Sequence, residues 1–272
     1  MAKLITDIDT NTVYFSWWIS ELKVYENIKE ILNNYGITNQ LLPHTKDYWV
    51  RDYMPIQISE TKFIQYRYNP DYLQNKKNYI TNSAFCNQSI GIITTNTGLI
   101  IDGGNIIKCE DCIIMTDKVF SENPNLSRID LINKLESFFQ VEIIFLPWDK
   151  YERYGHADGM VRFIGGNKIL LNNYINFDKR LRNVCINILK NKFHIKELNY
   201  KALHSKKNSW AYINFLQVGK LILLPSLNRI EDEIACSQFE ETFKGYHIEQ
   251  IDVREIVKLG GALNCISWNI KN

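Results

Sequence analysis

Residues 160–200 read MVRFIGGNKILLNNYINFDKRLRNVCINILKNKFHIKELNY and contain the pattern on which the fold depends. Two apolar runs flank the Gly-Gly-Asn sequence at 165–167, which is typical of a tight turn, so a β-hairpin is predicted over 160–171. The pattern that follows predicts a helix over 178–190 and a strand over 194–200. The order is therefore hairpin, helix, strand.

The same order returns toward the C-terminus. A hairpin is predicted over 212–227, a helix over 229–243 and a strand over 246–252. Other elements precede the quoted stretch: helices are predicted over 17–36 and 127–139, and strands over 49–58, 62–68, 98–104, 112–116 and 141–148. The repeated unit resembles a ring of ββαβ modules. An ordinary α+β sandwich would give much the same pattern, and residue-level similarity between the units is too weak to prove a repeat.

Composition indicates a globular enzyme or binding protein that builds a sizeable core. Hydrophobic residues make up 45% and charged residues 23% of the 272, and the formal net charge is +2. No dense basic stripe indicates a nucleic-acid partner, and no apolar run approaches the roughly 20 residues of a membrane span. No linker composition divides the chain, so one domain over 1–272 is expected. The start of the chain does not read as a signal peptide, which favours the cytoplasm. A homo-oligomer is left open.

The six cysteines are expected to be free thiols, because cytoplasmic thiols stay reduced. Cys109 and Cys112 have the spacing of a zinc knuckle or redox motif. A structural zinc site needs a second pair of ligands, and the chain has no other C-x-x-C or H-x-x-x-H sequence. The alternation around the pair instead predicts two strands joined by a tight Glu-Asp turn, and no metal is expected.

Two stretches combine charged residues with turn-forming residues. The first is YWVRDYMP at 48–55; on a strand, Trp49 and Arg51 would share one face and Asp52 the other. An Arg beside an Asp is often only a surface ion pair. The second is IDGGN at 101–105, where Asp and Asn are typical of a turn held by side-chain hydrogen bonds.

Two further stretches supply an imidazole and a thiol. In RYGHADG at 153–159, an extended backbone would place His156 and Asp158 on the same side. In KLGGALNCISW at 258–268, Cys265 follows two glycines close to the end of the chain. A thiol serves catalysis as a thiolate, so it requires a cation nearby or a cationic substrate.

This combination of residue types favours chemistry on a guanidine. Several aspartates would oppose the oxyanion of acyl transfer, which disfavours a protease or glutaminase. Two carboxylates can instead hold a planar guanidinium through paired hydrogen bonds. The positive charge of such a substrate would also help to ionise an approaching thiol.

The motifs occur in an order that resembles a known family. W-x-R-D-x-x-P, D-G-G-N, G-H-x-D, Y-x-N and G-G-x-x-N-C follow one another from Trp49 to Cys265. Together they resemble the agmatine deiminases and the Porphyromonas-type peptidylarginine deiminases of the guanidine-modifying superfamily. The resemblance implies the pentein fold, a five-bladed α/β propeller of ββαβ modules around a central active-site cavity.

The resemblance also implies roles for individual residues. Cys265 matches the nucleophile, His156 the general acid and base, and Asp52 with Asp158 the carboxylates that hold the guanidinium. Residues that would line or shape the substrate site are Trp49, Asp102, Gly104, Asn105 and Asn214. The implied reaction proceeds through a covalent S-alkylthiouronium at the cysteine and uses no metal or organic cofactor.

The expected function is conversion of agmatine or a related small guanidino compound to its ureido product and ammonia. Three alternatives stay open: a peptidylarginine deiminase, an amidinotransferase, and a non-catalytic pentein-fold binding protein. Two positions depart from the family pattern, since Asp102 stands where the agmatine deiminases generally carry Glu and Met54 where they carry Gly.

Overall fold

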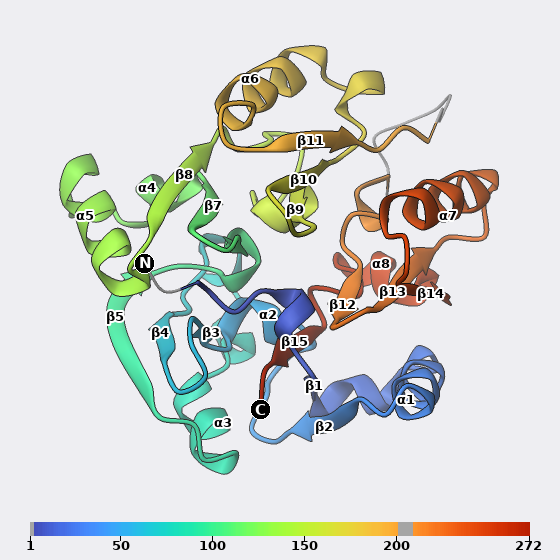
Figure 1. The fold of residues 1–272 in the computed structure, drawn as a ribbon. Coiled ribbons are helices and arrows are strands. Elements are labelled where there is room, and N and C mark those ends of the chain that lie inside the picture. The colour runs from blue at the N-terminus through green and yellow to red at the C-terminus, as the bar shows by residue number, and fades with distance from the viewer. Residues whose placement is uncertain (1–2, 201–208) are drawn as a thin grey trace.

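Five three-stranded sheets form a ring in the computed structural model, which describes residues 3–200 and 209–272 (Figure 1). The first strand of each sheet lies nearest the centre of the ring and the third lies outermost. In this order the sheets are β15 (Ser267–Ile270), β1 (Thr12–Ser16) and β2 (Thr38–Leu42); β3 (Ile56–Gln57), β4 (Phe63–Arg67) and β5 (Thr94–Ile100); β6 (Ile107–Lys108), β7 (Cys112–Thr116) and β8 (Glu142–Leu146); β9 (Val161–Phe163), β10 (Lys168–Leu171) and β11 (His194–Glu197); and β12 (Leu216–Val218), β13 (Leu221–Ser226) and β14 (His247–Asp252).

Every sheet follows one plan. Its first two strands are antiparallel and its second and third are parallel, so the chain must cross over between the latter pair. The crossovers contain α1 (Val24–Asn34), α3 (Ser83–Ser89), α4 (Lys118–Glu122) and α5 (Arg128–Phe139), α6 (Lys179–Leu189), and α7 (Ile230–Thr242). Two helices outside them are α2 (Val50–Tyr53) and α8 (Arg254–Leu259). This arrangement confirms the predicted ring of ββαβ modules.

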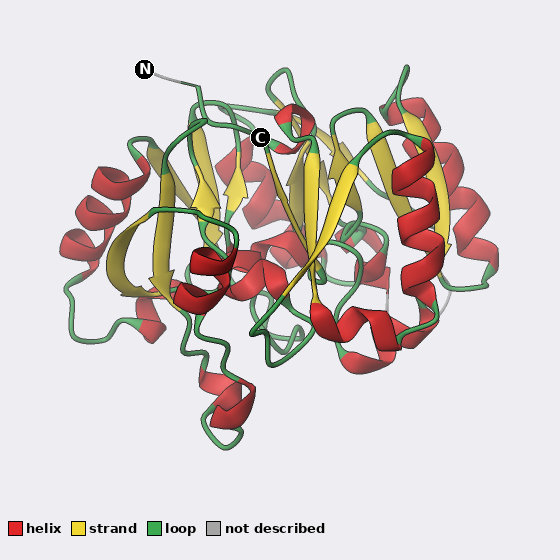
Figure 2. Cartoon of the chain, turned by 90° about the horizontal axis from the view of Figure 1, so that it is seen from below, coloured by secondary structure: helices red, strands yellow, loops and turns green. Residues whose placement is uncertain are grey.

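The ring is closed by the last strand of the chain. β15 pairs antiparallel with β1, from Thr12 opposite Ile270 to Phe15 opposite Ser267. The first strand of this sheet therefore comes from the C-terminus, whereas its other two strands come from the N-terminus. In the side view of Figure 2 the two termini lie toward the same end of the ring. Cys265 immediately precedes β15, so closure of the ring brings it to the centre.

Most predicted elements occur where the local pattern placed them. The hairpin over 160–171 is β9 and β10, and the predicted helix over 178–190 is α6. Cys109 and Cys112 join β6 to β7 as predicted, with the backbone N–H of Cys109 donating to the carbonyl of Cys112 at 2.9 Å. Both thiols are free and buried.

Two local predictions are wrong. Residues 49–58 were expected to form one strand, but α2 occupies the first half and only Ile56–Gln57 are extended. Pro55 explains the division, because it has no N–H to donate to a sheet. The extended backbone expected for 156–158 is also wrong after its first residue, since Ala157–Gly159 form a 3-10 turn.

Helices cover the outside of the sheets, and apolar clusters fill the space between them (Figure 2). In the largest cluster, Ile28 of α1 and Phe239 of α7 are fully buried with Leu223 of β13. No helix within the described residues is long and apolar enough to cross a membrane.

Trp268 of β15 is expected to contribute strongly to stability. Its side chain is 2% exposed, lies 5.3 Å from the ring of Tyr14 and 6.3 Å from that of Phe63, and donates from Nε1 to the carbonyl of Pro55. Trp268→Ala should lower the free energy of unfolding by about 3–5 kcal/mol, measured by urea denaturation. Trp17→Ala is the control, because Trp17 is 59% exposed. Equal losses in the two variants would contradict the importance of the closing strand.

Candidate active site

A cleft of about 580 Å³ opens at one end of the ring. Aromatic side chains form much of its wall, and three of the proposed reactive groups reach it. The cleft is lined by Trp18, Glu21, Lys46, Asp47, Tyr48, Trp49, Asp52, Tyr72, Leu73, Lys76, Tyr79, Arg153, Tyr154, His156, Leu259, Gly260 and Cys265. Trp49, Asp52, His156 and Cys265, which the sequence singled out, therefore share one wall.

The reactive side chains come from equivalent places in the five sheets. Each lies in the segment that leads into the first, innermost strand of a sheet, and these segments meet at the ring centre (Figure 1). Asp52 precedes β3, Asp102 precedes β6, His156 and Asp158 precede β9, Asn214 precedes β12, and Cys265 precedes β15.

Asp158 holds the segment that carries the thiol. Its Oδ2 accepts hydrogen bonds from Asn264 Nδ2 at 2.7 Å and from Asn214 Nδ2 at 2.9 Å. The Sγ of Cys265 lies 3.7 Å from the same oxygen. The backbone N–H of Cys265 also donates to Asn214 Oδ1 at 3.3 Å. Two amide side chains thus fix the relative positions of the carboxylate and the thiol.

His156 is placed between two carboxylates. Its Nε2 lies 3.0 Å from Asp102 Oδ2, and its Nδ1 lies 3.6 Å from Asp52 Oδ1. Burial by itself would lower the pKa of His156, but the charge of Asp52 and the hydrogen bond to Asp102 outweigh it and raise the pKa to about 10. The imidazole is therefore a cation at neutral pH.

Gly104 allows these groups to approach one another. Its N–H donates to Asp52 Oδ1 at 3.0 Å, so the backbone itself helps to hold the carboxylate. A Cβ on Gly104 would lie 2.7 Å from both Asp52 Oδ1 and His156 Nδ1, distances that real Cβ atoms do not adopt. Only glycine fits here without displacing the pair.

The thiol of Cys265 is protonated in the ligand-free site. Burial raises its pKa well above the ordinary value, and the negative charges of Asp158 and Asp52 raise it further. The glycine pair before it has a steric purpose, since a Cβ on Gly261 would lie 2.1 Å from the indole of Trp49. The tryptophan therefore packs directly on the backbone that leads to the thiol.

The other predicted site residues lie behind the cleft wall. Asp102 and Asn105 are both 1% exposed, and Asn105 accepts from the backbone N–H of Thr116 at 2.8 Å. The predicted turn at 101–105 exists as the 3-10 turn Gly103–Asn105. Met54 is fully buried in an apolar cluster. Among the residues that the structure describes, no group of three or more His, Cys, Asp and Glu side chains could hold a metal ion.

Sequence reasoning missed Lys118, whose side chain is 1% exposed. Its Nζ donates to the carbonyl of Tyr154 at 2.7 Å and lies 3.2 Å from Glu122 and Asp71 and 4.0 Å from Asp102. Burial would lower the pKa of Lys118, but these carboxylates outweigh it and raise the pKa. Lys118 thus links the loop of Tyr154, which lines the cleft, to Asp102, the hydrogen-bond partner of His156. In the sequence, the only sign of such a role was its position two residues after the end of the strand Cys112–Thr116.

Comparison with known proteins assigns the family. Residues 1–270 match the family model of Porphyromonas-type peptidyl-arginine deiminases. The chain belongs to this family. The resemblance carried by the five motifs is confirmed.

Relatives in this family share limited identity with the chain. A provisionally named agmatine deiminase of Legionella pneumophila is 27% identical over 196 residues, which cover 61% of this chain and 52% of that protein. A similarly named protein of Vibrio parahaemolyticus is 24% identical over 276 residues, which cover 82% of this chain and 75% of the relative. The chain thus spans about half the length of the Legionella relative that it matches.

Solved structures of deiminases share the fold. The agmatine deiminase of C. jejuni superposes with a TM-score of 0.80 at 19% identity, over 100% of this chain and 97% of that one. An agmatine deiminase of Enterococcus faecalis gives 0.77 at 15% identity, over 98% and 95%. A dimethylarginine dimethylaminohydrolase gives 0.62 at 14% identity, over 96% and 100%. The peptidyl-arginine deiminase family member described here therefore has the pentein fold.

Asp102→Asn is expected to lower the pKa of His156 by about one unit or more, because a neutral amide would replace the carboxylate that stabilises the imidazolium. NMR titration of protein with labelled histidine measures this directly. Asp149→Asn is the control, since Asp149 contacts Tyr174 and not His156. A His156 titration that is the same in wild type and Asp102→Asn would contradict the contribution of the Asp102 hydrogen bond to the raised pKa.

Proposed function

We propose that this protein is a guanidine iminohydrolase that converts a small guanidino compound, with agmatine as the first candidate, to its ureido product and ammonia. One observation carries the proposal: Asp52, His156 and Cys265 reach one cleft from three different sheets, and Asp158 lies 3.7 Å from Cys265 Sγ behind the cleft wall. Family membership and the agmatine deiminase names of the relatives support it.

The first half of the reaction uses the substrate's own charge. Asp52 and Asp158 accept hydrogen bonds from the guanidinium, so its central carbon faces Cys265 Sγ. The cation opposes the carboxylates that keep the thiol protonated, so the pKa of Cys265 falls as the substrate binds and the thiol proton is released to water, where it later converts the departed ammonia to ammonium. The thiolate attacks the carbon. His156, which is cationic in the resting site, gives its proton to the departing nitrogen, and ammonia leaves.

The second half reverses the role of the histidine. Loss of ammonia leaves an S-alkylthiouronium on Cys265 and a neutral His156. The imidazole takes a proton from water, and the resulting hydroxide adds to the same carbon. The C–S bond then breaks, which releases the ureido product and returns the thiol and the imidazolium. The sum is one guanidinium and one water converted to one ureido group and one ammonium.

Of the alternatives, a non-catalytic binder gains no support from this geometry. Asp102 is shorter than the family's usual Glu, yet its carboxylate still lies 3.0 Å from His156 Nε2. Met54, the other position that departs from the family pattern, packs in an apolar cluster and does not line the cleft. An amidinotransferase would share the first half-reaction, so the acceptor must be tested directly.

Purified protein should release ammonia and an equimolar ureido product from agmatine, assayed beside arginine and an N-acetylarginine amide. Cys265→Ala is expected to abolish turnover because the nucleophile is lost, while circular dichroism and the melting temperature stay close to wild type. Cys236→Ala is the control, since Cys236 lies on α7, outside the cleft.

Two outcomes would contradict the proposal. If the wild type releases no ammonia from any of the guanidines, the proposed reaction is excluded. If Cys265→Ala keeps full activity, Cys265 is excluded as the nucleophile. Transfer of the amidino group to added glycine, in place of ureido product, would assign the amidinotransferase.

We also propose that the cleft prefers a substrate with a cationic tail. Asp47 lines the cleft and is 8% exposed, and its Oδ1 accepts from the N–H of Trp49. The cations that line the cleft, Lys46, Lys76 and Arg153, are solvent-exposed and therefore strongly screened. A buried carboxylate interacts more strongly with a ligand than exposed groups do. Burial raises the pKa of Asp47 to about 7, and a bound ammonium would favour its charged form.

Asp47→Asn should raise the KM for agmatine about tenfold, which corresponds to the loss of one partly screened charge pair. Butylguanidine is the matched substrate, since it has the same chain length without the amine, and its KM should change little. The two values come from steady-state ammonia assays. An equal rise in KM for both substrates would show that Asp47 has a structural effect and does not recognise the tail.

A further inference from the structure

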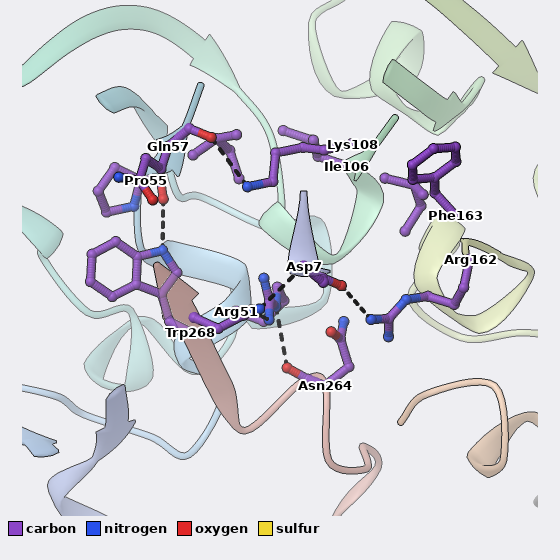
Figure 3. A pocket seen from close by; sticks show the side chains of 13 residues that line it. Asp7, Arg51, Pro55, Gln57, Ile106, Lys108, Arg162, Phe163, Asn264 and Trp268 are labelled. Carbon is purple, nitrogen blue, oxygen red and sulfur yellow. Dashed lines mark hydrogen bonds and ion pairs between the residues drawn. The ribbon is translucent and has the colours of Figure 1, made fainter. Parts of the chain in front are cut away.

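A second, much smaller cavity lies at the other end of the central strands (Figure 3). Its volume is about 30 Å³, enough for one or two water-sized groups. Gln57 and Lys108 end β3 and β6, whereas the active-site residues precede those strands. The cavity thus lies behind the cleft, and its lining residues Arg51 and Asn264 are the chain neighbours of Asp52 and Cys265.

The lining of this cavity carries more positive than negative charge. Arg51, Lys108 and Arg162 line it together with a single carboxylate, that of Asp7. Asp7 pairs with Arg162, with Oδ2 2.6 Å from Nη2. Its other oxygen accepts from Asn269 Nδ2 at 3.2 Å. One cation is thereby compensated, and the other two have no carboxylate within ion-pair distance among residues 3–200 and 209–272.

The other two cations donate to neutral oxygens. Arg51 donates from Nη2 to Asn269 Oδ1 at 2.6 Å and from Nε to the carbonyl of Asn264 at 3.3 Å. Lys108 Nζ donates to the carbonyl of Gln57 at 3.1 Å. Arg51 is 9% exposed and Lys108 is half-buried, and desolvation lowers the pKa of Lys108 to about 8. Buried cations without a paired anion are costly, so such a site favours an anion from solution.

We propose that this cavity binds one small inorganic anion of the size of chloride, held by Arg51, Lys108 and Arg162. The volume matches a single small ion and not an organic ligand. Only neutral oxygens, Asn269 Oδ1 and the carbonyl of Gln57, accept from Arg51 and Lys108 beside the cavity, and the indole of Trp268 closes one side. The proposal does not rest on the reaction proposed for the cleft.

Binding there would also act on the segment that carries the thiol. The backbone N–H of Arg51 donates to the carbonyl of Cys265 at 3.2 Å, and its guanidinium donates to the carbonyl of Asn264. Asp158 and Cys265 act electrostatically on Arg51 from the cleft side. An anion that compensates Arg51 would therefore stabilise the backbone on which Cys265 is held.

Crystals grown in sodium bromide provide the direct test. Anomalous scattering should show a bromide in contact with Arg51, Lys108 and Arg162. In solution, sodium chloride should raise the melting temperature in a saturable way, beyond the effect of sodium gluconate at equal ionic strength, because gluconate is too large to enter.

Lys108→Met removes one charge at nearly constant length and should raise the chloride concentration for half-maximal stabilisation about tenfold or more. Lys29→Met is the matched control, because Lys29 is exposed on α1, where it pairs with Glu26, and does not line the cavity. The wild type and the control should respond alike.

Three results would overturn the proposal. A cavity that contains only water in the bromide crystal excludes the site. A bromide peak without chloride-dependent stabilisation in solution would mark an adventitious ion only. An equal response to chloride in Lys108→Met, Lys29→Met and wild type would mark a general salt effect. Should Lys108→Met fail to fold, the bromide map of the wild type decides.

Discussion

The pairing of β15 with β1 is the constraint on which the rest of the molecule depends. Without it, the sheet of β1 and β2 would lack its innermost strand, and the ring would have an open edge. The pairing joins residues about 260 positions apart and sets the register from Thr12 to Phe15. Because Cys265 lies two residues before β15 begins, the register also sets the position of the thiol along the ring axis. The β15–β1 pairing therefore contributes both to the stability of the fold and to the placement of Cys265.

The fivefold plan explains why scattered motifs form one site. In each of the five equivalent modules, a short segment leads into the innermost strand and ends near the ring axis. We call this segment the entrance of the module. The chain can place one or two polar side chains at each entrance without burying a polar loop elsewhere. Hydrogen bonds then link neighbouring entrances, as Gly104 N–H does with Asp52 and Asn214 Nδ2 does with Asp158. The site is rigid because it is part of the closure of the fold.

Local patterns predicted the modules and the chemistry, but not the contacts made across the ring. Hairpin and helix signals over 160–190 depend on neighbouring residues and were sufficient for β9, β10 and α6. The four-residue strand Ser267–Ile270 has its partner at the other end of the chain, so no local signal revealed it. Lys118 was missed for a similar reason, since its carboxylates come from separate loops. Asp52 was predicted from the family resemblance and not from its local pattern, and it reaches the site from a helical turn.

The distribution of charge along the ring axis gives the two ends different chemistry. Carboxylates gather at the cleft end, where Asp52 and Asp158 raise the pKa of Cys265 and attract a cation. Cations gather at the opposite end, and Arg51 lies between the two groups. Each cluster would be unstable if it were buried alone, but a charge of opposite sign further along the axis lowers the cost of both. The guanidinium of Arg51 partly balances the acids from below, so the proposed guanidinium substrate would balance them only at the side that faces the cleft. Under that proposal the thiol stays protonated until the substrate binds.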